Sequence, residues 1–237
     1  MEPGALKRRL VAATVARYRE AGRFARYFAR GKLNADPVFT AILALGLIPD
    51  RARVLDLGCG QGLLGAWLLA AEASGLAGHW CAAWPEPARD CHFYGIERRP
   101  REVQRARLAL GARGLVEVAD LRAAHYPESD VAVLLDVLHY LDPPAQELVL
   151  ARVRAALTPA GLLLLRIGDA SAGLAFRYST WVDRAVVALR GQGRAQLHCR
   201  SAAHWIELLQ RLGFGTDQIP LSEHAPFANV LLVAQPR

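Results

Sequence analysis

The sequence predicts an α/β protein with a doubly wound, mostly parallel sheet. From Arg53 onward, apolar runs alternate with amphipathic helical segments, which is the rhythm of strands joined by crossover helices. Runs such as VAVLLDVL are apolar on both faces, as expected of strands covered by helices on both sides. The chain has 237 residues, 53% of them hydrophobic, which is enough to bury a sizeable core.

The individual strands and helices are predicted from the periodicity of apolar residues and from the positions of glycine and proline. The apolar runs predict strands at Arg53–Leu57, His92–Glu97, Leu115–Val118, Val131–Leu135, Gly161–Ile167 and Asn229–Ala234. The helical pattern predicts helices at Pro37–Leu47, Leu63–Ala73, Pro100–Leu110, Ala145–Leu157, Ser179–Leu189 and Ala202–Leu212. Another helical pattern begins near Leu6, and Gly22 is expected to weaken or divide it. Residues 74–93, with two tryptophans and two prolines, predict an ordered insertion where a few residues would suffice.

The positive charge is concentrated at the N-terminus. Residues 1–32 carry nine basic and two acidic side chains, which accounts for the whole net charge of +7. A basic run is usually a solvated face, yet its confinement to one element indicates an acidic partner. We therefore expect residues 1–50 to form an N-terminal helical cap or lid, and residues 51–237 to form the main domain.

The cysteines and the hydropathy pattern indicate a cytoplasmic protein without a transmembrane segment. The four cysteines form no CxxC pair, which favours reduced thiols over a disulfide framework. No apolar stretch approaches the roughly 18 residues of a membrane span, and the start lacks a secretory leader pattern. Two histidines and two cysteines in and beside the insertion follow no zinc-finger spacing, and we expect no metal site: His79, Cys81, Cys91 and His92.

The stretch VLDLGCGQGLLG, Val54 to Gly65, has the pattern of a strand, a glycine turn and a helix. Such a turn can point backbone N–H groups at a ligand near a helix N-terminus. Dinucleotide enzymes use the spacing G-x-G-x-x-G, but Leu63 stands where the third glycine would be. A nicotinamide dehydrogenase is therefore disfavoured, whereas a tight turn without a ligand remains an alternative.

The pattern of Gly58, Gly60 and Gly62, introduced by Asp56, resembles motif I of the class I S-adenosylmethionine-dependent methyltransferases. The resemblance implies a Rossmann-like methyltransferase fold with a seven-stranded sheet and S-adenosyl-L-methionine as cofactor. It also implies cofactor contacts along the turn, from Asp56, Gly58, Cys59, Gly60, Gln61 and Gly62. A narrower resemblance, carried by IERRPREV and LLDVLHYLD, is to bacterial methyltransferases of aryl polyene and fatty-acid-like biosynthesis.

Further cofactor contacts are expected in order along the sheet. Glu97 ends the second strand, where an acidic residue can accept hydrogen bonds from ribose hydroxyls, and Arg98 follows it. After the third strand, Asp120 matches the family's acceptor for the adenine amino group, and Leu121 could flank the purine. Asp136, at the end of the fourth strand, completes the expected cofactor-binding residues. Taken singly, such acids are more often solvated surface residues.

His139 and Tyr140 are the catalytic candidates. They follow the fourth strand at the carboxyl edge of the sheet, where open α/β folds place their crevice. An imidazole, with an ordinary pKa of about 6.5, suits proton abstraction at neutral pH. His139 could equally cap the next helix, and Tyr140 could be a pocket wall. Asp136 and Asp169 form no convincing metal triad, so we expect metal-independent transfer.

The substrate is expected to be a small aromatic or acyl-type intermediate of secondary-metabolite biosynthesis, free or bound to a carrier protein. Candidate substrate contacts are Tyr27, Arg177, Tyr178 and Trp181. The basic N-terminal helix would receive an acidic acyl carrier protein, with an anionic membrane or nucleic acid as the alternative partners. Alternative functions are a nucleic-acid methyltransferase, disfavoured because LDVLHY replaces the N/D-P-P-Y/F tetrapeptide, and a non-catalytic interaction module.

Overall fold

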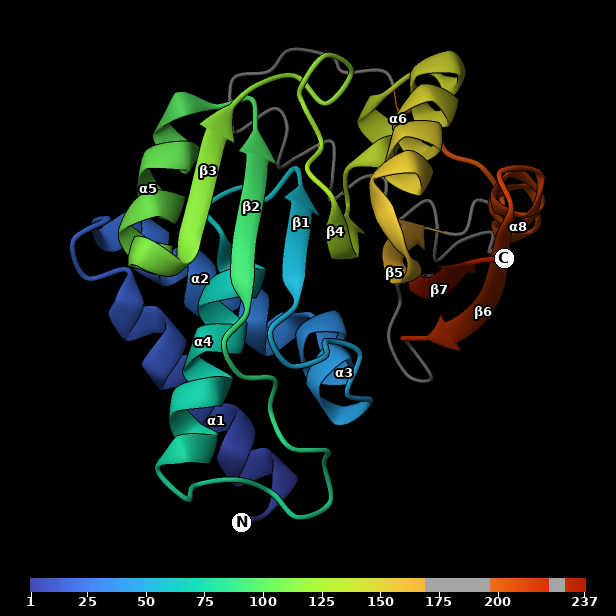
Figure 1. Ribbon diagram of the computed structural model, residues 1–237. Coiled ribbons are helices and arrows are strands. Elements are labelled where there is room, and N and C mark those ends of the chain that lie inside the picture. The colour runs from blue at the N-terminus through green and yellow to red at the C-terminus, as the bar shows by residue number, and fades with distance from the viewer. Residues whose placement is uncertain (169–196, 222–228) are drawn as a thin grey trace. The chain divides into compact units, whose positions relative to one another are not determined.

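The structure is a computed structural model that describes residues 1–168, 197–221 and 229–237 (Figure 1). The chain divides into two compact units, Met1–Val131 and Ala132–Arg237, and each is described by itself. The predicted helix at Ser179–Leu189 lies outside the described residues.

The first unit contains the N-terminal helices and three parallel strands. Its helices are α1 (Pro3–Arg17), α2 (Arg23–Ala35), α3 (Pro37–Ala44), α4 (Leu63–Leu76), α5 (Pro100–Leu110) and the short η1 (Gly111–Arg113). Its strands are β1 (Arg53–Leu57), β2 (His92–Glu97) and β3 (Gly114–Val118). Because β2 pairs in parallel with both β1 and β3, the carboxyl ends of all three strands meet at one edge, as the arrowheads in Figure 1 show.

The second unit continues from β4 (Ser129–Leu135), a strand that begins in the first unit. Its other described elements are η2 (Leu138–Tyr140), α6 (Pro143–Ala156), β5 (Leu157–Gly168), α8 (Ala202–Arg211), β6 (Phe214–Pro220) and β7 (Asn229–Pro236). β7 runs antiparallel to both β5 and β6.

The seven strands are hydrogen-bonded in the order β3-β2-β1-β4-β5-β7-β6. This order confirms the predicted α/β fold class with its seven-stranded, mostly parallel sheet. None of the six strands predicted by residue range corresponds to β6. Gly215, Asp217 and Pro220 interrupt the alternation of apolar and polar residues that would predict a strand there. Its pairing with β7 supplies the backbone hydrogen bonds that local sequence does not predict.

The N-terminal helices are packed into the first unit. Gly22 adopts a φ of 96° between α1 and α2, so the predicted division of the helical pattern occurs there. Leu6, Leu10, Tyr18 and Leu33 are fully buried. Residues 1–50 therefore share the core of this unit, and their role as a cap or lid stays a prediction.

The segment after α4 is held by contacts of its own. α4 extends through Gly75 to Leu76, so the predicted insertion begins inside this helix. Beyond the helix, the indole N–H of Trp80 donates to the Pro85 carbonyl at 2.8 Å. Nearby, the Ser74 hydroxyl donates to the carbonyl of His79 at 2.7 Å.

Two kinds of feature are absent from the residues that the structure describes. Within residues 1–168, 197–221 and 229–237, no helix is long and apolar enough to cross a membrane. In the same part of the chain, no group of three or more histidine, cysteine and acidic side chains is arranged to hold a metal ion.

Gly75→Ala should lower the free energy of unfolding by about 1–3 kcal/mol, because an added Cβ would lie 2.5 Å from the ring atom Cγ of Pro87. The matched control is Gly31→Ala in α2, where the added methyl would meet no atom within 4 Å. Higher helix propensity should make the control more stable by about 0.5–1 kcal/mol. Urea unfolding of both variants measures the difference, and equal stabilisation by both would contradict the contact with Pro87.

Candidate functional site

Three left-handed residues carry the chain from β1 into α4. Gly58, Gly60 and Gly62 have φ values of 75°, 55° and 73°, and Gly62 is the N-cap of α4. Only glycine adopts such angles without a steric penalty, which explains the residue type at all three positions. The turn therefore has the left-handed backbone that its glycine spacing suggested.

Most backbone donors of this turn are already used inside the protein. The N–H groups of Gly58 and Cys59 both donate to the Ile96 carbonyl, at 2.8 and 3.2 Å. The N–H of Gly60 donates to Glu97 at 3.2 Å, and that of Gly62 to Cys59 at 2.9 Å. The expectation that the glycine turn offers free N–H groups is wrong for these four residues, because β2 and the turn itself satisfy them.

The glycines instead leave the turn without side-chain atoms, so that other groups can approach its backbone. A Cβ added at Gly60 would meet no atom within 4 Å, so this residue borders open space. A Cβ added at Gly62 would lie 3.0 Å from Ala106 of α5, and one added at Gly65 would lie 2.7 Å from Leu110. One side of the turn and helix thus packs closely on α5, while Gly60 leaves room for a ligand.

Two buried carboxyl groups, Asp56 and Glu97, lie beneath the turn, each 8% exposed. Glu97 accepts hydrogen bonds from the N–H of Gly60 at 3.2 Å, and from the backbone and side chain of Arg99 at 2.9 and 3.0 Å. Burial, together with the charge of Glu97, raises the pKa of Asp56 to about 7. Two acidic side chains thus adjoin a turn whose glycines have no side chains of their own.

This arrangement fits a cationic ligand of the predicted kind. S-adenosylmethionine carries an ammonium group and a sulfonium but no phosphate, so it needs carboxylates more than free backbone N–H groups. Open space at Gly60, with Asp56 and Glu97 adjoining the same turn, meets that need. A bound cation would also relieve the unfavourable burial of the Asp56 charge.

The N-terminal helices hold the turn from the other side. The buried hydroxyl of Tyr18, the residue that caps α1, donates to the Gln61 carbonyl at 3.0 Å. The Gln61 side chain in turn donates to the carbonyl of Ala25 in α2 at 3.0 Å. Within the described residues, the Gln61 Oε1 atom is buried and has no hydrogen-bond partner. The position of the turn therefore depends on α1 and α2 as well as on the sheet.

Cys59 packs inward. A Cβ added at Gly95 of β2 would lie 2.8 Å from the Cys59 Sγ atom, so the thiol occupies the space that this glycine leaves. Burial raises the pKa of the Cys59 thiol well above its usual value. Its side chain is a neutral packing group, and any cofactor contact from this residue would come from its backbone.

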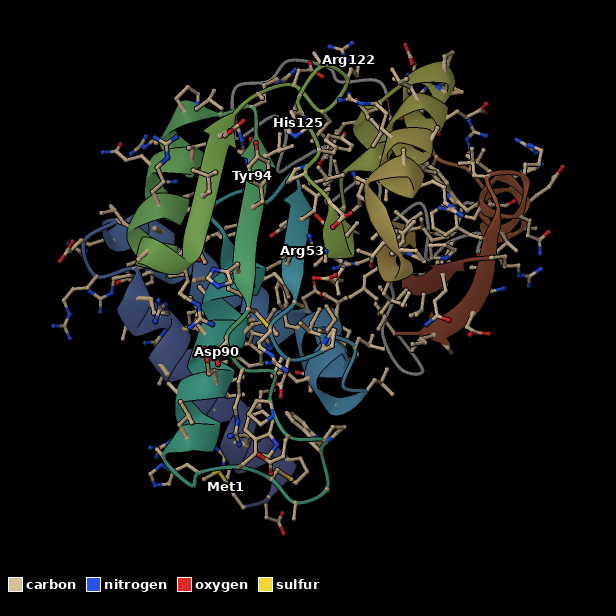
Figure 2. All side chains as sticks on the ribbon, in the orientation of Figure 1. Met1, Arg53, Asp90, Tyr94, Arg122 and His125 are labelled. Carbon is tan, nitrogen blue, oxygen red and sulfur yellow. The ribbon has the colours of Figure 1, made fainter. Side chains whose placement is uncertain are left out.

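Asp120 and Leu121 lie in the loop after β3, at the carboxyl edge, where Figure 2 labels Arg122. The Arg122 guanidinium donates two hydrogen bonds to Asp120, at 2.9 and 2.6 Å, and holds the pKa of that carboxyl at about 2. The Leu121 carbonyl accepts a hydrogen bond from the Tyr126 hydroxyl at 2.7 Å. Asp120 is thus ionised at neutral pH and partly exposed, as a hydrogen-bond acceptor for a ligand must be.

In the second unit, Asp136 directly follows β4 and has a left-handed conformation, with a φ of 59°. Such a conformation is strained for a residue with a Cβ and is often found at functional sites. The Arg166 side chain of β5 lies 3.1 Å from the Asp136 carboxylate. This ion pair orients the carboxylate at the end of β4.

His139 and Tyr140 lie on η2, three and four residues after Asp136. Their rings are in contact, with centroids 4.1 Å apart, and Tyr140 is 40% exposed. The remaining predicted substrate residues divide between two places. Tyr27 is 66% exposed on α2 of the first unit, whereas the other three lie outside the described residues: Arg177, Tyr178 and Trp181.

Sequence reasoning missed two residues that shape the first unit's site. Arg99 fixes Glu97, whereas the predicted Arg98 is exposed. Tyr18 holds the turn through its hydroxyl, which donates to the Gln61 carbonyl. Arg99 is only two residues from Glu97, whereas the contact of Tyr18 with Gln61 joins segments that the fold brings together.

Comparison with known proteins agrees with this geometry. Residues 55–163, from β1 into β5, match a family described as "Methyltransferase domain". A relative named carboxy-S-adenosyl-L-methionine synthase, from Chromohalobacter salexigens, is 36% identical over 132 residues. The match covers 51% of this chain and 43% of the relative, so the chain spans less than half of that protein's length.

Two solved structures share the fold at low sequence identity. Magnesium protoporphyrin IX methyltransferase (ChlM) from Synechocystis PCC 6803, with bound SAH, has a TM-score of 0.59 at 18% identity, covering 94% of each chain. The mitomycin 7-O-methyltransferase MmcR has a TM-score of 0.61 at 20% identity, covering 90% of this chain and 56% of its own.

The family match and the fold together define the class of this domain. Residues 55–163 match the methyltransferase-domain family, and the fold is shared with solved methyltransferases. The resemblance read from the glycine turn is therefore confirmed at the level of the methyltransferase domain and its cofactor class. The narrower resemblance to a biosynthetic subfamily stays a prediction.

Asp56→Asn should stabilise the ligand-free protein at alkaline pH. Between its ordinary pKa of 3.8 and the folded value of about 7, the unfolded chain ionises Asp56 while the folded chain does not, so wild-type stability falls as pH rises through this window. The variant lacks this loss, which amounts to about 4 kcal/mol above pH 7. Urea unfolding at pH 4, 6 and 8 measures it.

The matched control is Asp217→Asn, on the exposed part of β6, which should keep the wild-type pH profile. Asp56→Asn should also weaken binding of S-adenosylhomocysteine, because the ammonium group loses an anionic partner. An Asp56→Asn profile that parallels wild type from pH 4 to 8 would show that the carboxyl is not held protonated.

Proposed function

We propose that the protein transfers a methyl group from S-adenosylmethionine to a small aromatic or acyl-type intermediate of secondary-metabolite biosynthesis. The observation that carries the proposal is the pair of buried acids, Asp56 and Glu97, beside the glycine turn. The match of residues 55–163 to a methyltransferase domain supports it. When bound, S-adenosylmethionine would supply an electrophilic methyl group.

The first unit would hold the cofactor. Asp56 would face the ammonium group, Glu97 the ribose hydroxyls and Asp120 the adenine amino group, with Leu121 against the purine. Glu97 is oriented for this by Arg99, and Asp120 by Arg122. Glu97 and Asp120 are thus fixed before the ligand arrives, which lowers the entropic cost of binding.

His139 would be the base. A hydroxyl or amine acceptor becomes a better nucleophile as it loses a proton, and the His139 imidazole would take that proton. The contact with the Tyr140 ring limits the orientations that His139 can adopt. Holding the acceptor and excluding water would make up the rest of the catalysis.

The exposed face of α2 would receive the carrier-bound form of the substrate. Four arginines are exposed at helical spacing along and just before this helix, at Arg19, Arg23, Arg26 and Arg30. Phe24 and Tyr27 are exposed between them, at 58% and 66%. An acidic carrier protein complements this charge, and the aromatic rings would contact the tethered group.

The helix that bears this surface also contacts the cofactor turn. Ala25, on the buried side of α2, accepts the hydrogen bond from Gln61 through its carbonyl. A carrier bound to α2 would therefore present its tethered group to the unit proposed to hold the methyl donor. We further propose a cytoplasmic setting, which the four free cysteines support.

Calorimetry should show binding of S-adenosylmethionine and S-adenosylhomocysteine. Incubation with S-adenosylmethionine and a panel of phenols and hydroxybenzoates should yield S-adenosylhomocysteine and a methylated acceptor. Mass spectrometry identifies both products. A nucleoside product heavier than S-adenosylmethionine would instead mean that the cofactor itself is modified, and absence of binding would overturn the proposal.

His139→Ala should reduce turnover of the best acceptor by about 10²–10⁴-fold, the usual contribution of a general base, while S-adenosylhomocysteine affinity stays unchanged. His92→Ala, at the exposed start of β2, is the matched control and should behave as wild type. Turnover of His139→Ala within twofold of the control would assign His139 a scaffolding role only.

Reversing the charge of Arg23, Arg26 and Arg30 to Glu should raise KM for a hydroxybenzoyl-loaded acyl carrier protein by about tenfold or more. Association of charged partners depends steeply on such complementarity. KM for free hydroxybenzoate should stay the same, because no arginine of this set is proposed to contact the reacting atoms. Steady-state kinetics at two salt concentrations measures both values.

The control reverses the same amount of charge elsewhere, at Arg8, Arg51 and Arg211, which are all exposed. It should leave both KM values unchanged. An equal rise of KM in the two triple variants would trace the effect to net charge, and an equal rise for free and tethered substrate would exclude a carrier-specific role for α2.

A further inference from the structure

Gln146 of α6 is a polar side chain with no exposed surface. Its Nε2 atom lies within hydrogen-bond distance of three backbone carbonyls: Leu138 at 3.0 Å, Leu141 at 3.0 Å and His198 at 2.8 Å. An amide group has only two N–H donors, so the three carbonyls share them. Buried carbonyls are costly to leave unsatisfied, which makes this cluster a strong local constraint.

The carbonyls belong to two chain segments that meet here. Leu138 and Leu141 flank His139 and Tyr140 on the turn after β4. His198 lies far along the sequence, and its backbone N–H donates to the His139 carbonyl at 2.9 Å. Gln146 therefore clamps the turn that carries the proposed base against the segment at residues 197–200.

The other end of the amide is anchored too. The Gln146 Oε1 atom accepts a hydrogen bond from the Arg200 side chain at 2.8 Å. Arg200 also reaches the exposed Glu147 at 3.0 Å and the Pro143 carbonyl at 3.2 Å. Both ends of the Gln146 amide are thus used, and its orientation is set by partners on each side.

We infer that Gln146 is a positioning residue: it fixes His139 and Tyr140 by holding residues 138–141 and 197–200 together. This inference rests on the proposed role of His139 as base. Gln146 does not touch the reacting atoms. Small displacements of a catalytic group lower turnover without weakening cofactor binding, since the acids to which the proposed function assigns the cofactor, Asp56, Glu97 and Asp120, belong to the first unit.

The chemistry of the clamp requires an amide. A carboxylate at position 146 would keep, and strengthen, the contact with Arg200. In place of Nε2 it would also put an acceptor oxygen against three carbonyl oxygens, and so remove every side-chain bond from residue 146 to the turn. Gln146→Glu therefore removes the bonds to the turn but keeps the contact with Arg200. Its matched control is Glu147→Gln, which weakens the ion pair with Arg200 but keeps the Gln146 amide.

Hydrogen exchange read by mass spectrometry tests the clamp without any substrate. In Gln146→Glu, peptides covering residues 138–141 and 197–200 should exchange at least about tenfold faster than in Glu147→Gln, because segments that lose their bonds to Gln146 open more often and expose their N–H groups. Peptides of β5 should exchange alike in both variants. Equal exchange of the two segments in Gln146→Glu and Glu147→Gln would overturn the inference.

Turnover is then expressed per S-adenosylhomocysteine-binding site, counted by calorimetry. For the best acceptor of the panel, Gln146→Glu should lose about ten- to a hundredfold in kcat with an unchanged Kd, and Gln146→Met should show the same loss. A kcat per site within twofold of Glu147→Gln would refute the positioning role. Failure of the wild type to bind S-adenosylhomocysteine would refute the proposed function instead, while the exchange result would still report on the clamp.

Discussion

The turn from β1 into α4 passes through three left-handed residues, and the first unit is arranged around that turn. Gly62 and Gly65 bring α4 close to α5, where a methyl group on either residue would collide. Gly60 leaves open space on the other side. From the N-terminal side, Tyr18 and Gln61 bind the turn to the helices before it. The left-handed conformation of this turn thus determines how α4 packs on α5, where space for a ligand remains and how α1 and α2 contact the turn.

Two carboxyl groups close to each other and to this turn are unfavourable for the ligand-free protein. The raised pKa of Asp56 records that cost, since burial and the charge of Glu97 both oppose its ionisation. A positively charged ligand would offset it. Asp56 therefore lowers the stability of the ligand-free protein and favours binding of a cationic ligand. Such opposing effects are common at functional sites.

The second unit uses a different means of holding its candidate residues. Asp136 occupies a strained left-handed conformation and is paired with Arg166. Gln146 satisfies the carbonyls of the following turn and of a distant segment. Short turns at strand ends have few hydrogen bonds of their own, so a buried side chain from the next helix supplies them. In both units, the groups proposed for chemistry are oriented by neighbours that take no part in it.

The sequence alone determined what depends on near neighbours in the chain. Apolar runs and glycine spacing predicted the fold class, the β1–α4 turn and the order of Glu97 and Asp120 along the sheet, since strand periodicity and left-handed turns are local properties. Tertiary structure decided the rest. β6 needed β7 as a partner, and Gln146 acquired its place only when residues 138–141 met residues 197–200. Contacts between distant segments leave no pattern in either segment, because each residue there is common and unremarkable until the fold supplies its partner.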